Sequence, residues 1–443
     1  MIVDRRRALK LAVAGAFCSA LPWHRSAAEP ISPVHGEGYT RYDLANGLRV
    51  HCCRSRSRHI NAGLLLRSKE ITAHGGLAHI MEHTSFTGAA GQLTARELKQ
   101  KRKAVIQEGN AFTAPGVLGW YASFLPKYAS EALELLAITS LNQRFDVETV
   151  SSEVRIILQE LFLDKYSSAG AVRRRVQAVL YGPDHPFGRD TLEAEIAKAR
   201  TPARKLITEL QDFAATIRLP SNMDVILVGE SEPGRLRDIA EEHFGHYPHA
   251  AGPMLELPRT GPVRAYQTLS GTTGDLRHPL TETRITWNTG VAIGDPDAPI
   301  LAAMSECLNE AIFAELREKR GDTYSPEVSY EPSTCGGVFT ISVTSDKKPG
   351  DVERRIFQVF EQIRSGGTPL ELENLVERWE LRRGKTADSA DLILENMIAR
   401  VVDGCALEDL DISSVSPSDI AAAARKYLPE YRGAYIRLGL LGS

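Results

Sequence analysis

The pentapeptide His79-Ile80-Met81-Glu82-His83 contains the side chains of this sequence best suited to bind a metal ion. Residues four apart on a helix present their side chains on one face, so both imidazoles can meet one ion. Glu82 reaches the same face and can take a proton from a metal-bound water. The pattern predicts a hydrolytic zinc site, although two histidines at the edge of a core beside an unrelated glutamate also fit the pentapeptide alone.

A hydrolytic zinc site needs a third protein ligand and one open position for water. From Val147 to Leu163 apolar residues recur at helical spacing, and Glu153 and Glu160, seven apart, lie above one another at the border of this apolar stripe. We take Glu160 as the candidate ligand and Glu153 as a supporting carboxylate. Periodicity alone leaves this choice open, because two glutamates at such a border are usually solvated.

The segment from Gly76 to His83 resembles the zinc-binding segment of the pitrilysin and insulinase family of metallopeptidases, which includes the mitochondrial processing peptidases. In that family a later helix carries Glu-x6-Glu, and the second glutamate completes the metal site. Glu153 and Glu160 fit this pattern. The resemblance therefore implies one Zn²⁺ per chain, bound by Glu160 and the two histidines, with Glu82 as the general base.

Two further segments are similar to the family. Asn110-Ala111-Phe112-Thr113 resembles its edge strand, onto which an extended substrate adds as another strand, although an ordinary sheet edge also accounts for these residues. The run 316–321 followed by Tyr324 resembles its second-domain signature, in which an arginine and a tyrosine reach the substrate carbonyl. Arg317 and Tyr324 fit those positions, whereas Asp322 stands where the family usually has an apolar residue.

A chain of 443 residues suits two domains with separate cores. A segment rich in Pro, Gly and Thr at 256–274 is the expected linker between residues 29–255, which contain the metal motifs, and residues 275–443. Strand and helix patterns follow a similar order on both sides. With the resemblance, this predicts an α+β fold of two similar domains, each an antiparallel sheet covered on one side by helices, enclosing a chamber.

Residues 1–28 differ from the rest of the chain. Basic residues at 5–7 precede an apolar run from Leu11 to Leu21, and small residues precede Glu29. This order predicts a signal peptide and a periplasmic or secreted protein. The paired arginines resemble a twin-arginine export signal, and a general secretory signal fits nearly as well. No other apolar run approaches the roughly 20 residues needed to span a bilayer, so no membrane partner is expected.

The formal net charge of -3 shows no excess of either sign, which argues against a nucleic-acid surface. A helix is predicted from the capping box of Thr94 and Glu97 to Gly109, and its basic residues are interpreted as a solvated face. The six cysteines contain no C-x-x-C pair. They predict neither a disulfide framework nor a thiolate zinc site, and they leave one disulfide open.

These features together predict a zinc-dependent endopeptidase that hydrolyses extended peptides or unfolded segments in a closed chamber, with Glu82, Arg317 and Tyr324 as catalytic residues. Two alternatives remain: a non-catalytic or partner-dependent binding subunit of a paired peptidase, and a zinc hydrolase for an amide on a small molecule. The sequence does not specify the substrate. It also leaves open whether the chain works alone, as a homodimer, or with a second family member.

Overall fold

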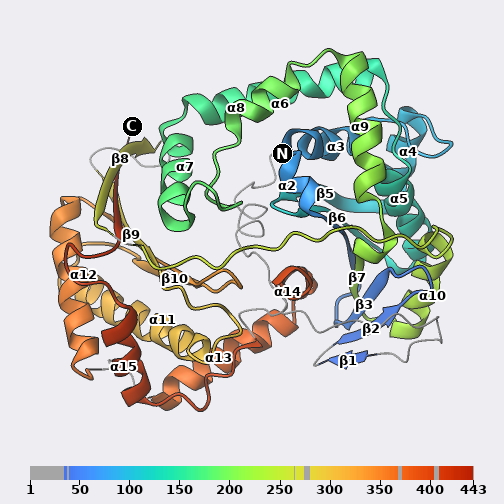
Figure 1. Ribbon diagram of the computed structural model, residues 1–443. Coiled ribbons are helices and arrows are strands. Elements are labelled where there is room, and N and C mark those ends of the chain that lie inside the picture. The colour runs from blue at the N-terminus through green and yellow to red at the C-terminus, as the bar shows by residue number, and fades with distance from the viewer. Residues whose placement is uncertain are drawn as a thin grey trace.

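Two mixed sheets, each with its own helices, make up the computed structural model (Figure 1). It describes residues 34–36, 39–263, 265–273, 280–367, 372–403 and 409–442, so the predicted signal peptide lies outside the described residues. An extended segment without helix or strand, residues 248–263, crosses from the first half to the second. No helix in the described part of the chain is both long and apolar enough to cross a bilayer.

The first sheet has the strand order β1-β2-β3-β7-β4-β6-β5, which places β5 at one edge. Neighbouring strands are antiparallel except β3 and β7, which are parallel because a long helical connection brings the chain back before β7. The sheet is therefore mixed and not purely antiparallel. Its strands are β1 (Val34–Gly36), β2 (Tyr39–Asp43), β3 (Arg49–Arg54), β4 (Ile60–Arg67), β5 (Ile106–Ala114), β6 (Val117–Phe124) and β7 (Met223–Gly229).

Helices of the first half cover one face of this sheet and share a large apolar core with it. They are α2 (Lys69–Ala73), α3 (Gly75–Thr87), α4 (Ala95–Val105), α5 (Ala129–Leu141), α6 (Val147–Tyr166), α8 (Leu192–Ala199), α9 (Ala203–Ile217) and α10 (Pro233–Phe244), with the short helices η1 (Pro126–Tyr128) and η2 (Pro220–Asn222). The opposite face, which includes Leu65, Phe112 and Ile226, packs against α14 (Ala390–Asp403) of the second half.

The second sheet has the order β10-β11-β9-β12-β8, again with one parallel pair, β12 and β8. Its strands are β8 (Gln267–Thr273), β9 (Thr281–Asn288), β10 (Glu327–Glu331), β11 (Val338–Ser345) and β12 (Ile436–Gly442). Its helices are α11 (Ala298–Phe313), the π-helical η3 (Ala314–Glu318), α12 (Pro349–Arg364), α13 (Leu372–Ala387) and α15 (Pro417–Tyr427). Residues 267–273, inside the expected linker, are thus a strand of this sheet.

Each half contributes one helix to the other. Helix α7 (Ser168–Tyr181) of the first half packs through Leu180 on Leu269 and Leu438 of the second sheet, as α14 packs on the first sheet. The α+β prediction is confirmed, but the expectation of helices on one side only is incomplete. The second face of each sheet is apolar and is covered by a helix that is distant in sequence, which periodicity cannot reveal.

Helix α4 is shorter than predicted. Its capping box is present, but the helix ends at Val105 and not near Gly109, because residues 106–114 pair with β6 instead. A β-bulge between Ile106 and Glu108 adjusts the register at this transition. Tertiary pairing therefore overrides the local signal. The described cysteines, Cys52, Cys53, Cys307 and Cys335, are buried free thiols, while Cys18 and Cys405 lie outside the described residues.

Candidate metal centre and active site

Helix α3 presents His79 and His83 on one face, as their spacing predicts. Gly76, in its first turn, lets α8 approach closely, because a Cβ there would lie 3.0 Å from the side chain of Lys198. The same approach brings Glu195 of α8 beside His79. The glycine therefore has a packing role that supports the histidine site.

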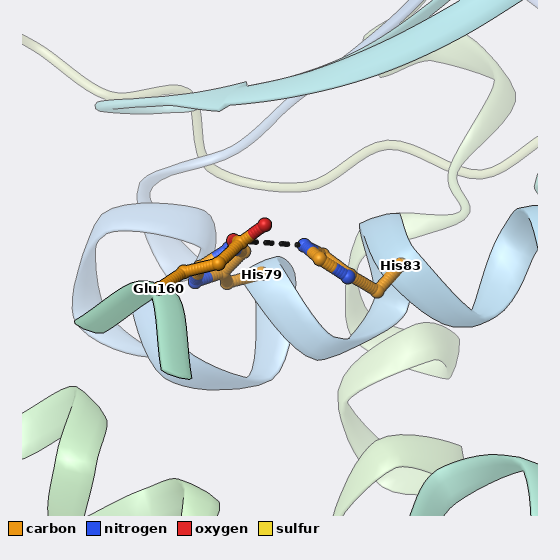
Figure 2. A group of neighbouring side chains, drawn as sticks. All are labelled: His79, His83 and Glu160. Carbon is orange, nitrogen blue, oxygen red and sulfur yellow. Dashed lines mark ion pairs between the residues drawn. The ribbon is translucent and has the colours of Figure 1, made fainter. Parts of the chain in front are cut away.

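Glu160 of α6 lies opposite both histidines (Figure 2). Its Oε2 atom is 3.7 Å from His79 Nε2 and 3.4 Å from His83 Nε2, and the three ligand atoms all lie within 4.8 Å of one another. Zinc ligands at about 2.0–2.2 Å in a tetrahedral site are separated by roughly 3.3–3.6 Å. These nitrogen and oxygen atoms therefore fit a zinc ion with little movement, and the donor set of two imidazoles and one carboxylate is one that zinc accepts.

A second carboxylate lies behind each histidine. His83 Nδ1 is 3.3 Å from Glu153 Oε2, and His79 Nδ1 is 3.5 Å from Glu195 Oε2. Such contacts hold the imidazole ring in place and strengthen the opposite nitrogen as a ligand. Glu153 is where the sequence predicted a supporting carboxylate. Glu195 was missed, because it lies on a separate helix and no spacing connects it to the histidines.

Carboxylates also control the protonation of the cluster. Burial lowers the pKa of His79, but the carboxylates of Glu160 and Glu195 outweigh this effect and raise it to about 9. Burial raises the pKa of Glu195, and its hydrogen bonds to His79 and to Thr191 outweigh that and lower it. A metal ion must displace a proton at His79, so acid solution weakens metal binding at this cluster.

Glu82 lies between the metal cluster and the edge strand. Its Oε2 accepts a hydrogen bond of 2.7 Å from the Thr113 hydroxyl of β5. Burial raises the pKa of the Glu82 carboxyl, and the nearby histidines and the Thr113 hydroxyl offset this only in part. A carboxyl with a raised pKa is a better proton acceptor and donor near neutral pH than an ordinary one. The Thr113 hydrogen bond and the burial thus keep Glu82 as the candidate general base.

The predicted substrate strand, residues 110–113, lies in β5 and pairs with β6 on one side only. Within the described residues no strand pairs with its other side. Phe112 turns into the core and packs over Gly119, where a Cβ would lie 2.4 Å from the phenyl ring. The backbone of β5 can therefore accept an added strand, next to the carboxylate that Thr113 holds.

Comparison with known sequences places these residues in a family. A profile described as "Insulinase (Peptidase family M16)" matches residues 61–182, and one described as "Peptidase M16 inactive domain" matches residues 206–379. The chain belongs to the insulinase (M16) peptidase family. The resemblance read from the sequence is confirmed, and the three candidate ligands lie within the first of these matches.

Relatives of this M16 chain are named as zinc proteases. An uncharacterized zinc protease of Mycobacterium leprae is 29% identical over 365 residues, which is 78% of each chain. One from Mycobacterium tuberculosis is 26% identical over 367 residues, covering 80% of this chain and 81% of the relative. The crystal structure of a protease from Helicobacter pylori has the same fold, with a TM-score of 0.74 at 17% identity, covering 91% of this chain and 99% of that one.

In the second half of this M16 protein, Arg317 and Tyr324 lie together. The Arg317 guanidinium is 5.2 Å from the centre of the Tyr324 ring, which is 83% exposed. Among the described residues, no hydrogen bond or ion pair connects either side chain with the metal cluster. The structure therefore brings the two residues to each other, without a polar contact to the histidines within the described residues.

Asp322, the departure from the family pattern, is buried and forms an ion pair with Arg355 of α12. Its backbone N–H donates to the Leu316 carbonyl at 2.8 Å, and the Thr323 hydroxyl donates to the Thr344 carbonyl at 2.7 Å. These contacts fix the loop just before Tyr324. The acid is thus compensated by a basic partner that the sequence pattern did not indicate.

Proposed function

We propose that this protein is a zinc-dependent endopeptidase that hydrolyses extended peptides or unfolded segments. The observation that carries the proposal is the hydrogen bond between Thr113 of the edge strand and Glu82, beside the His79, His83 and Glu160 cluster. A peptide that adds to β5 as a further strand passes this carboxylate and the cluster. A small-molecule amide has no extended backbone that could pair with the open edge of β5.

Each group of residues has its own role in the proposed hydrolysis. When bound, zinc polarises the scissile carbonyl and lowers the pKa of a coordinated water. Glu82 takes a proton from the attacking water at its carboxylate and passes it to the nitrogen of the leaving amine. Glu153 and Glu195 hold the two imidazoles in orientation. Backbone groups of residues 110–113 align the peptide, which keeps the scissile bond at a fixed distance from Glu82.

Arg317 and Tyr324 are proposed to stabilise the oxyanion that develops on the scissile carbonyl. This role requires the second half, which begins with β8, to close over the metal-binding first half so that the two enclose the substrate. The exposed position of Tyr324 supports the proposal, since the phenol is available to a ligand from outside its own half. A closed chamber of this kind admits unfolded chains and excludes folded proteins.

The export signal predicted at 1–28 supports a periplasmic or secreted location. A solved periplasmic protease from Escherichia coli shares the fold, with a TM-score of 0.70 at 14% identity. A second candidate function is that of a partner-dependent subunit, as a homodimer or with another family member. Among the described residues no polar contact joins Arg317 or Tyr324 to the metal cluster, which favours this alternative, in which a partner completes the site.

Zinc analysis with peptide-library digestion of the purified mature chain tests these functions. One zinc per chain with cleavage that Glu82→Gln abolishes supports the endopeptidase. Zinc binding without cleavage, restored by adding a second family member, supports the partner-dependent subunit. Absence of zinc and of cleavage under both conditions refutes the proposal.

A further inference from the structure

Helix α4 has a row of basic side chains without acidic partners. Arg96, Lys99 and Lys103 are spaced three and four residues apart, so they lie on one face, opposite the buried Leu98. All three are exposed, and within the described part of the chain none forms an ion pair. Some exposed basic residues elsewhere in this half do, as Arg54 does with Glu232. We call these three residues the α4 basic stripe.

Helix stability explains only part of the stripe. Lys99 and Lys103 are four residues apart, a spacing at which like charges repel on a helix. Arg96 lies in the first turn, where the positive end of the helix dipole disfavours a cation. The acid of this helix, Glu97, accepts hydrogen bonds from the Thr94 backbone at 2.9 Å and hydroxyl at 2.7 Å, so its carboxylate is engaged in the cap. Lys103 lies in the last turn, where the negative end of the dipole favours a cation, but the dipole does not favour Arg96, and Lys99 repels Lys103.

The position of α4 connects the stripe to the proposed substrate strand. Arg102, on the inner side of the helix, donates to the carbonyls of Ser85 and Phe86, both at 3.1 Å. These carbonyls belong to α3, the helix of the two histidines, so α4 is fixed relative to the metal cluster. At this same C-terminal end, α4 continues directly into β5 at Ile106. Lys103 therefore lies three residues from the end of β5 that is away from Thr113, and Lys99 and Arg96 continue the stripe along the helix from there.

We propose that the α4 basic stripe binds carboxylate side chains of an acidic segment of the peptide substrate. The inference rests on the proposed peptidase function, since it requires a peptide along β5. An extended strand rises about 3.3 Å per residue, so substrate residues opposite 106–109 lie roughly four to seven residues from the position beside Thr113. Glu108 is the one acidic residue of the sequence between Lys103 and Asn110, and the three basic residues of the stripe outnumber it.

A charge-reversal variant of the full-length zinc-loaded protein tests the proposal. The variant carries Arg96→Glu, Lys99→Glu and Lys103→Glu. A control, Arg56→Glu with Arg58→Glu and Arg204→Glu, makes the same change in net charge at exposed residues of the β3–β4 loop and α9. Substrates are pairs of otherwise identical peptides with Glu or Gln at four to seven residues from the cleaved bond, on its N-terminal or its C-terminal side.

At low salt we expect the wild type to prefer the Glu peptide in one of the two pairs, either the N-terminal or the C-terminal one, and to cleave it about tenfold better than its Gln counterpart. Three exposed ion pairs together account for a preference of about this size. The preference should fade at about 1 M salt, where the screening length is about 3 Å. The stripe variant should lose the preference and keep the rate on Gln peptides, and the control should retain both. An unchanged preference in the stripe variant, or equal loss in the control, overturns the proposal.

Binding measurements keep this inference separate from the proposed function. Fluorescence anisotropy of labelled Glu and Gln peptides, with Glu82→Gln as the background, reports affinity without turnover. If the wild type cleaves no peptide, the peptidase function fails, and a stripe-dependent, salt-sensitive preference for the Glu peptide would still support the binding site. Equal affinity for both peptides in this background refutes the stripe.

Discussion

Replacing Glu195 with glutamine tests how the outer carboxylates support the metal site. His79 Nδ1 lies 3.5 Å from Glu195 Oε2, while its Nε2 faces Glu160. The substitution keeps the size of the side chain and removes the charge that orients the imidazole and strengthens it as a ligand. We expect zinc affinity to fall about 10- to 100-fold, equivalent to about 1.4–2.8 kcal/mol.

Glu153→Gln is the matched substitution at the other histidine. Its carboxylate is 3.3 Å from His83 Nδ1, and the side chain is 8% exposed, against 22% for Glu195. Water can replace the lost contact more easily at the exposed position. We therefore expect Glu195→Gln near the lower end of this range and Glu153→Gln near the upper end. Glu160→Ala removes a ligand and should weaken zinc binding more than either.

Competition with a fluorescent zinc chelator measures the Kd of each variant, and thermal unfolding of the metal-free proteins checks that the fold is intact. An unchanged Kd for Glu195→Gln in a folded protein would refute the support assigned to this carboxylate. If Glu153→Ala weakened binding more than Glu160→Ala, the roles of the two glutamates on α6 would have to be reversed.

Four further predictions concern the active site and two buried carboxyls. Glu82→Gln should keep zinc and lose hydrolysis, because an amide cannot accept the proton, and turnover near wild type would exclude Glu82 as the base. Tyr324→Phe should lower kcat more than it changes KM, on the order of 10- to 1000-fold in rate, and a silent substitution would remove Tyr324 from the oxyanion role. Burial raises the pKa of Asp224, but its arginine partners outweigh this and lower it well below the usual value, so its stabilisation is present at neutral pH and is lost only in strong acid. Asp224→Asn should therefore cost about 3–5 kcal/mol at pH 7 by chemical denaturation, because it removes the carboxylate that neutralises those partly buried arginines. Burial alone raises the pKa of Asp403 well above its usual value, so Asp403→Asn should stabilise the fold at pH 7 and not below pH 4, and destabilisation at pH 7 would contradict this assignment.

The sequence determined the local features of this protein. His79, Glu82 and His83 share a helix face because 3.6 residues make one turn, and the same periodicity places Glu153 and Glu160 together. These relations hold for any helix, whatever packs around it. The capping box at Thr94 was likewise readable, since its two hydrogen bonds join residues three apart.

Only the tertiary structure decided which distant segments meet. Glu195 reaches His79 because α8 packs on α3, and β5 is an edge strand because, among the described strands, β6 alone pairs with it. The exchange of α7 and α14 between the halves, and the contact of Asp322 with Arg355, also join residues far apart in the chain. Side-chain periodicity reports which face of an element is apolar but not which partner covers it, because that choice depends on the packing of the whole chain.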